Sequence, residues 1–114
     1  MFKVVYLLAR RRDIDRAAFW RHWSQVHVPL VEKLPGLVKY IVEPVTGSPD
    51  EEPLHFDGVA ELYYRDRATF DHAQSSPEMA TAIRDTPNFT ERVTAAFVEE
   101  HVVRPGPEGA SGPS

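Results

Sequence analysis

Apolar residues occupy both alternating positions along the first stretch of the chain. Residues 2–9 have the sequence FKVVYLLA, a run of aromatic, β-branched and aliphatic side chains. Because successive side chains of a strand point to opposite faces, this pattern predicts a strand that is buried on both faces. Further strands are predicted at residues 37–45, 56–64 and 96–103.

The apolar pattern changes to a helical period after the first strand. Asp13 is a suitable N-cap, and residues 14–34 are predicted as one long helix that ends at Pro35-Gly36. Pro29 lies inside this helix, so we expect a kink at which the carbonyl of Gln25 loses its partner. At 100° per residue, one helix face collects Phe19, Trp20, Trp23, Val26, His27, Leu30, Val31 and Leu34.

The second half of the chain adds two shorter helical segments before the last strand. A helix is predicted at residues 67–74, capped by Asp66, and another from Pro77 to about residue 84. Residues 87–94 are predicted as a turn or short helix. The resulting order is β-α-β-β-α-β, which is typical of an α+β ferredoxin-like sandwich with helices on one face of a four-stranded antiparallel sheet.

The other face of that sheet needs a cover. Four strands of about six residues present roughly 400 Å² of mixed surface, and the first strand is apolar on this side too. A second copy of the chain is the simplest cover, so we predict a homodimer.

Composition limits the chain to one domain. It has 114 residues and a mass of 12.9 kDa, which is room for a single core. Residues 104–114 contain three Pro, three Gly and two Ser, a composition typical of a flexible tail. We therefore predict a domain at residues 1–103 and a tail at residues 104–114.

Charge and cysteine content exclude several classes of function. Lys and Arg number 13 against 17 Asp and Glu, a net charge of −4, which argues against binding to nucleic acid. The N-terminal apolar run is too short for a membrane span or a signal peptide. The absence of cysteine suits a reducing compartment, so we expect a cytoplasmic protein with no membrane partner.

His27 is the first candidate for chemistry, because it lies on the apolar helix face between Trp23 and Leu30. A buried imidazole can act as acid or base near pH 7, although a core histidine can instead simply bond a backbone carbonyl. Asp57 and Glu61 are four residues apart on a predicted strand and share a face. They suit a general acid/base pocket if that face is enclosed, and are solvated charges if it is open.

Metal ligation and phosphate binding receive little support. His55 with Asp57, or Glu99 with His101, could supply ligands, but no cluster has diagnostic spacing. His22 and His27 are five apart, about 140° around an α-helix, so they cannot share one ion. We predict no metal site. The sequence also lacks a Gly-rich phosphate loop and a nucleophile elbow.

Three segments resemble the EthD-like family in the same order. They are FWRHWSQVHVPLVEKLPGLVKY at residues 19–40, FDGVAELYY at residues 56–64, and DTPNF at residues 85–89. Together they span nearly all of residues 2–103. The resemblance implies a dimeric α/β barrel, in which two ferredoxin-like sheets pack face to face, as the bare sheet face also suggests.

The resemblance also implies site residues. In the methylmuconolactone methylisomerase branch, a helix His and the Tyr after the Pro-Gly turn lie in the active pocket, and His27 and Tyr40 match them. That branch's pocket Cys has no counterpart here. The positions expected to surround the substrate are Trp20, Trp23, Asp85 and Phe89, with Asp57 and Glu61 positioning or relaying the proton.

These observations predict a cofactor-independent isomerase, cyclase or lyase. Its substrate would be a small carbonyl, lactone or aromatic (polyketide-like) metabolite, with His27 moving a proton and Tyr40 stabilising the developing oxyanion. Two alternatives stay open. One is a haem- or flavin-dependent oxidase or another oxygenase on the same barrel, and the other is a non-catalytic, small-molecule-binding accessory dimer.

Overall fold

The four strands form one antiparallel sheet in the order β2-β3-β1-β4. The computed structural model describes residues 1–50 and 52–107. β1 pairs with both β3 and β4, and β2 pairs with β3, every time antiparallel. This is the predicted ferredoxin-like order. The strands are β1 (Phe2–Arg10), β2 (Leu37–Pro44), β3 (Gly58–Tyr64) and β4 (Thr90–Val98).

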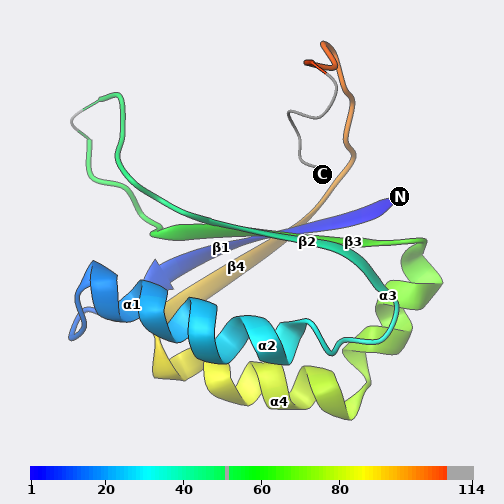
Figure 1. The fold of residues 1–114 in the computed structure, drawn as a ribbon, viewed down its shortest axis with the longest axis horizontal. Helices are drawn as coiled ribbons and strands as arrows, with labels where there is room; N and C mark the ends of the chain where they lie inside the picture. Colours follow the sequence, from blue (N-terminus) through cyan, green and yellow to red (C-terminus); the bar gives the residue numbers. More distant parts are fainter. Residues whose placement is uncertain (51, 108–114) are drawn as a thin grey trace.

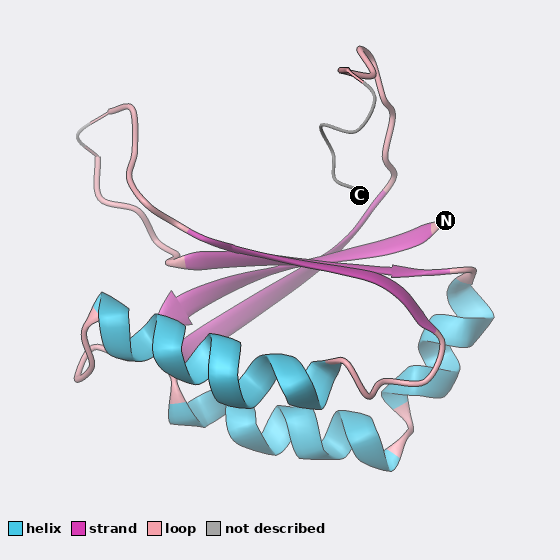
Figure 2. Ribbon diagram, in the orientation of Figure 1, coloured by secondary structure: helices cyan, strands magenta, loops and turns pink. Residues whose placement is uncertain are grey.

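Helices cover only one face of this sheet (Figures 1 and 2). On the opposite side, the β2–β3 loop and the segment after β4 rise above the sheet (Figure 1). No helix lies on that side among residues 1–50 and 52–107. The helical segments are α1 (Arg16–His22), the π-helical turn η1 (Trp23–His27), α2 (Val28–Val31), α3 (Arg67–Gln74), α4 (Pro77–Asp85) and the 3-10 turn η2 (Thr86–Asn88).

The predicted long helix is interrupted by η1. Its N-cap is Asp15, whose side chain accepts from the Ala18 N–H at 2.8 Å, and not Asp13, which pairs with Arg11. In η1 the Val28 N–H bonds the Trp23 carbonyl five residues earlier. The wide turn directly precedes Pro29, whose ring would clash with the carbonyl four residues back in regular α geometry. The irregularity expected at Pro29 therefore takes the form of a π-helical turn.

Two strand boundaries differ from the prediction. β3 begins at Gly58, so residues 56–57 precede the strand, and β4 occupies Thr90–Val98 where residues 96–103 were predicted. β4 pairs with almost the whole of β1, from Lys3↔Val98 to Arg10↔Thr90. The length of β1 thus sets the position of the last strand, which the weak apolar pattern of residues 90–98 did not reveal.

The caps of the later helices agree with the prediction. Asp66 caps α3 by accepting from the Thr69 N–H, and Ser76 caps α4 by accepting from the Met79 N–H. Of the predicted tail, residues 104–107 are exposed and irregular, and residues 108–114 lie outside the described residues. Within the described part of the chain, none of the helices is both long and apolar enough to cross a membrane.

The hydrophobic core lies between the sheet and the helices, and Trp23 is at its centre. The indole is fully buried and packs against Phe19 at a ring-centroid distance of 5.5 Å. It also lies directly over Gly58 in β3, where a β-carbon would come within 2.4 Å of the indole ring. Glycine at this position allows the helix to approach the sheet closely. The other buried members include Val4, Leu8, Leu62, Tyr64, Phe70 and Phe89.

Replacing Gly58 with Ala tests this contact. A fully buried indole cannot move freely, so we expect Gly58→Ala to lower the free energy of unfolding by about 1–3 kcal/mol. Urea denaturation followed by tryptophan fluorescence measures the loss. Gly47→Ala is the matched control, because no atom lies within 4 Å of its added β-carbon. Equal stability of the two variants would contradict the assigned role of Gly58.

Candidate functional site: a histidine–aspartate pair at an apolar cavity

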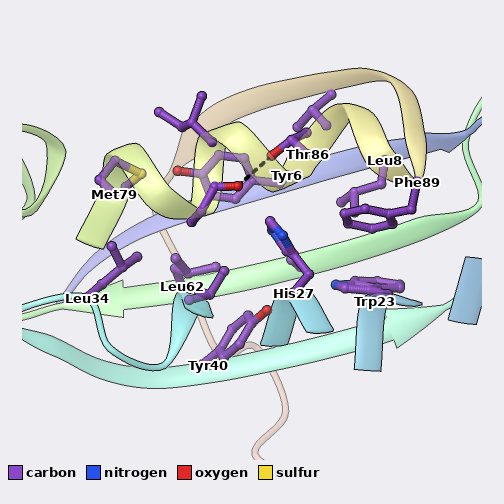
Figure 3. Close-up of a pocket in the computed structure, with 15 residues that line it drawn as sticks. Tyr6, Leu8, Trp23, His27, Leu34, Tyr40, Leu62, Met79, Thr86 and Phe89 are labelled. Carbon is purple, nitrogen blue, oxygen red and sulfur yellow. Dashed lines mark hydrogen bonds between the residues drawn. The ribbon is translucent and has the colours of Figure 1, made fainter. Parts of the chain in front are cut away.

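A cavity of about 280 Å³ lies between the helices and the helix-covered face of the sheet. Its polar side chains are Tyr6, His27, Tyr40 and Thr86, and no Asp, Glu, Lys or Arg lines it. The cavity can therefore enclose a small, largely apolar molecule and offer it a few hydrogen-bonding groups. Apolar lining residues include Leu8, Trp23, Leu34, Leu62, Met79 and Phe89 (Figure 3).

His27 reaches the cavity from η1 and is held from behind by Asp85. Its Nδ1 lies 2.9 Å from Asp85 Oδ2, and its ring packs against Phe89 at a centroid distance of 4.9 Å. An ionised carboxylate can only accept hydrogen bonds, so this contact places the proton on Nδ1. Nε2 is then the nitrogen with a lone pair for a molecule in the cavity.

Asp85 is nearly buried at the end of α4, with 8% of its surface exposed. Its carboxylate also lies 2.8 Å from His22 Nε2 and accepts a hydrogen bond from Asn88 Nδ2 at 3.1 Å. Burial alone would raise the pKa of Asp85, but the hydrogen bonds from Asn88, His22 and His27 lower it below its usual value. Asp85 is therefore an anion at neutral pH.

The surroundings of His27 favour the neutral imidazole. Burial lowers the pKa of His27, and the nearby Asp85 opposes this effect only in part. A neutral ring with its proton on Nδ1 is the form that can act as a general base through Nε2.

Tyr40 lies on β2 opposite Leu62 and points its hydroxyl toward the His27 and Trp23 side of the cavity (Figure 3). Burial raises the pKa of Tyr40, and a hydrogen bond from Trp23 offsets only part of that rise. The phenol therefore keeps its proton at neutral pH and can donate to an oxygen atom. Tyr6, on β1, is a second phenol in the cavity, and burial raises its pKa as well.

The structure corrects the expectation about His22. Regular α-helical geometry would put His22 and His27 140° apart, whereas both imidazoles bond the one Asp85 carboxylate. The π-helical turn explains the difference, because residues five apart come to the same side where the hydrogen bonds run from i to i+5. Pro29 was the signal that could have revealed this pairing.

Asp57 and Glu61 do not line the cavity that contains His27. Asp57 precedes β3, and its carboxylate accepts from the Arg10 N–H at 2.8 Å. Glu61 lies on the sheet face without helices, 2.6 Å from Lys3 Nζ. Partial burial alone would raise the pKa of Glu61, but the hydrogen bond from Lys3 lowers it below its usual value. Both carboxylates have basic partners away from the cavity.

The predicted substrate-binding residues divide into two groups. Trp23 and Phe89 line the cavity. Trp20 is not among the residues that line it: the residue is 39% exposed, and its ring packs edge-to-face against Trp23 at a centroid distance of 5.6 Å. Asp85 lies behind His27 and so acts on the imidazole, not on a cavity ligand.

The two remaining candidates for metal ligation, His55 and His101, lie at the surface. His101 makes only an exposed pair with Glu99 at 3.2 Å, and His55 is exposed at the β2–β3 loop. Across residues 1–50 and 52–107, no group of three or more His, Asp or Glu side chains is arranged to hold a metal ion.

Fold and site together define a ferredoxin-like α+β protein with a buried histidine–aspartate pair at an apolar cavity. The chain belongs to the EthD family, since the EthD domain pattern matches residues 11–92. A Rhodococcus erythropolis protein, an uncharacterised 11.0 kDa product of the thcB-thcC intergenic region, is 38% identical over 92 residues. That match covers 80% of this chain and 88% of the relative.

Solved structures agree with this assignment. An EthD family protein from Bacillus halodurans is similar with a TM-score of 0.75 and 29% identity, covering 89% of this chain and 100% of the other. Two more distant structures show the fold alone. A dimeric ferredoxin-like protein from Thermobifida fusca has a TM-score of 0.69, 12% identity and coverages of 87% and 90%. SnoaB, a cofactor-independent oxygenase from Streptomyces nogalater, has a TM-score of 0.64 and 12% identity. That match covers 92% of this chain and 97% of SnoaB.

Asp85→Asn tests the support of the two imidazoles. An amide oxygen is a weaker acceptor and carries no charge, so we expect a loss of about 1–3 kcal/mol in unfolding free energy at pH 7. Because the pKa of Asp85 is lowered on folding, its stabilisation is present above its usual pKa of 3.8 and disappears as the pH falls through the folded-state pKa. The difference from wild type, followed by urea denaturation, should shrink over that acid range.

Asp71→Asn is the control for this measurement, because Asp71 forms an exposed pair with Arg67. It should change stability by less than about 0.5 kcal/mol. The Asp85→Asn variant could instead lose no more unfolding free energy than this control, or lose an amount that does not depend on pH. Either result would show that Asp85 does not hold the imidazoles as an ionised hydrogen-bond acceptor.

Proposed function

We propose that this protein catalyses proton transfer on a small carbonyl, lactone or aromatic compound without a cofactor, as an isomerase, cyclase or lyase. One observation carries the proposal: His27 lines an apolar cavity while the buried Asp85 holds its Nδ1 at 2.9 Å, which leaves the lone pair on Nε2. An imidazole that is oriented by a carboxylate and lines an apolar cavity suits general base catalysis.

The reaction begins with removal of a proton from the carbon next to a carbonyl. Nε2 of His27 takes the proton, and the C–H electron pair moves into the carbonyl group to give an enolate. Tyr40 donates a hydrogen bond to the enolate oxygen. Where a C=C bond is conjugated with the enolate, return of the proton from Nε2 to the γ-carbon completes an isomerisation. Attack of the enolate carbon on a second carbonyl of the same molecule forms a ring, and the resulting alkoxide takes up the proton from Nε2.

The lining of the cavity sets the class of substrate. A charged group would lose its hydration with no Asp, Glu, Lys or Arg beside it, which is costly. The volume of about 280 Å³ suits a molecule with one or two rings. The substrate we propose is uncharged and mainly apolar, with carbonyl or phenol oxygens for Tyr40 and Tyr6.

A second candidate function uses the same base. SnoaB, which shares the fold, is a cofactor-independent oxygenase. In this reading, the carbanion formed at His27 reacts with dioxygen in place of being reprotonated. Oxygen uptake during turnover separates the two reactions, and binding without either product would indicate the accessory, non-catalytic role.

Deuterium exchange in D₂O tests the base directly, because it detects proton removal whatever the later product. The probes are uncharged cyclic ketones, aryl ketones and lactones, followed by loss of the α-proton signal in NMR. For a probe that the wild type exchanges, we expect His27→Gln to slow exchange by about 10²–10⁴-fold. Tyr40→Phe should slow it by about 10²-fold.

The rate of deuterium exchange should also fall as the solution becomes more acidic. Because burial lowers the pKa of His27, the base is already deprotonated at pH 7, and exchange falls only at pH values below its usual 6.5. His101→Gln, at an exposed position, serves as control and should leave the rate unchanged. Equal exchange by His27→Gln and the wild type would remove His27 from the mechanism.

We also propose that two copies pair through the sheet face without helices. Val5, Leu7, Ile41 and Val59 lie on this face and outside the core cluster, and a dimeric protein has the same fold. Covering these side chains with a second sheet would remove their apolar surface from water.

Native mass spectrometry tests the pairing. The wild type should have twice the 12.9 kDa chain mass, and Leu7→Glu should give the single-chain mass because it places a charge in the middle of the interface. Ala68→Glu, an exposed change on α3, should stay dimeric. A wild-type protein that is monomeric at micromolar concentration would contradict the pairing.

A further inference from the structure

The mechanism proposed above leaves one titratable side chain at the site without a role, namely His22. Its Nε2 lies 2.8 Å and 3.0 Å from the two oxygens of Asp85, and its ring stacks on Phe89 at a centroid distance of 5.0 Å. His27 contacts the same carboxylate and packs against the same aromatic ring at a centroid distance of 4.9 Å. Two imidazoles therefore share one anion.

Sharing one anion limits how much positive charge the pair can hold. A single carboxylate can balance one imidazolium, and a second imidazolium beside the first would be repelled in a partly buried site. The two rings differ in exposure, with 26% of the His22 side chain accessible and 12% of the His27 side chain. Solvent stabilises a charge on the more exposed ring at lower cost, so positive charge favours His22.

We propose that His22 is a positioning residue that keeps His27 in its base form, by holding the positive charge of the pair on the solvent side of Asp85. The inference rests on the proposed function, in which His27 must be unprotonated at Nε2. Positive charge on His22 neutralises Asp85 and so weakens the attraction that would otherwise draw a proton onto His27. His22 thus extends the range of pH over which His27 can accept a proton from a cavity ligand.

The other groups around His27 do not carry charge near neutrality. Asn88 contributes an amide from η2, and Tyr40 from β2 and Tyr6 from β1 are phenols whose pKa burial raises. Repulsion from His22 also lowers the pKa of His27, in agreement with the geometry. Asp85 and His22 are therefore the neighbouring groups whose charge acts on His27.

NMR titration of the histidine rings tests the inference without any substrate. His27→Gln identifies the His27 signals by their loss. In His22→Gln the side chain can still donate to Asp85 but cannot become charged, so we expect the titration midpoint of His27 to rise by about 0.5–1 pH unit. In His22→Lys a lasting positive charge should keep the midpoint at or below its wild-type value.

The opposing effects of Gln and Lys separate charge from packing. His72→Gln, at an exposed position on α3, is the control and should leave the midpoint of His27 unchanged. If Gln and Lys at position 22 gave the same His27 midpoint, the inference would be overturned. Should His22→Gln fail to fold, His22→Asn provides the same uncharged comparison.

Deuterium exchange provides the functional counterpart. In His22→Gln the acid limb of the exchange rate should move to higher pH by the same amount as the His27 midpoint, with the rate at pH 8 within about twofold of wild type. A shifted midpoint without exchange of any probe would contradict the proposed function and leave the role of His22 supported. An unchanged His27 midpoint together with normal exchange would support the proposed function and contradict the role assigned to His22.

Discussion

The buried carboxylate of Asp85 is the interaction on which the site depends. Asp85, at the end of α4, is bonded to α1 through His22 and to η1 through His27. It is also bonded to η2 through Asn88. A nearly buried anion that lost these donors would face the full cost of desolvation. The same bonds that make burial of Asp85 tolerable also set the tautomer of His27, so the stability of the helix layer and the chemistry of the cavity have one cause.

A second constraint acts between the helices and the sheet. The indole of Trp23 lies against Gly58, and this close approach positions η1 above the centre of the sheet. His27, in the same turn, consequently reaches into the space between the layers, opposite Tyr40 on β2. Apolar packing thus places the polar groups, which contribute little to the core themselves.

The cavity and the bare sheet face lie on opposite sides of one four-stranded layer. Tyr40 and Leu62 point toward the helices, while Lys3 and Glu61 pair on the other side. Alternation along each strand separates the two surfaces. Binding chemistry and the proposed pairing of two chains can therefore vary independently within this fold, since they use different sets of side chains on the same strands.

The sequence by itself determined the element order, the fold class, and His27, Tyr40, Trp23 and Phe89 as cavity residues, because local periodicity and motif resemblance are properties of short segments. It could not place Asp57 and Glu61. Their partners, Arg10 and Lys3, are more than forty residues away along the chain, so only strand pairing brings them together.

The sequence also named Asp85, but only the tertiary structure decided that it bonds His27 and that His22 belongs to the site. Ideal α-helical angles separate His22 from His27, and only the π-helical turn before Pro29 turns both toward one carboxylate. That carboxylate comes from a helix about sixty residues further along the chain, and the packing of the two helices brings it there. Local sequence determines which side chains are available, whereas packing determines which of them meet, because hydrogen bonds between distant segments depend on the whole fold.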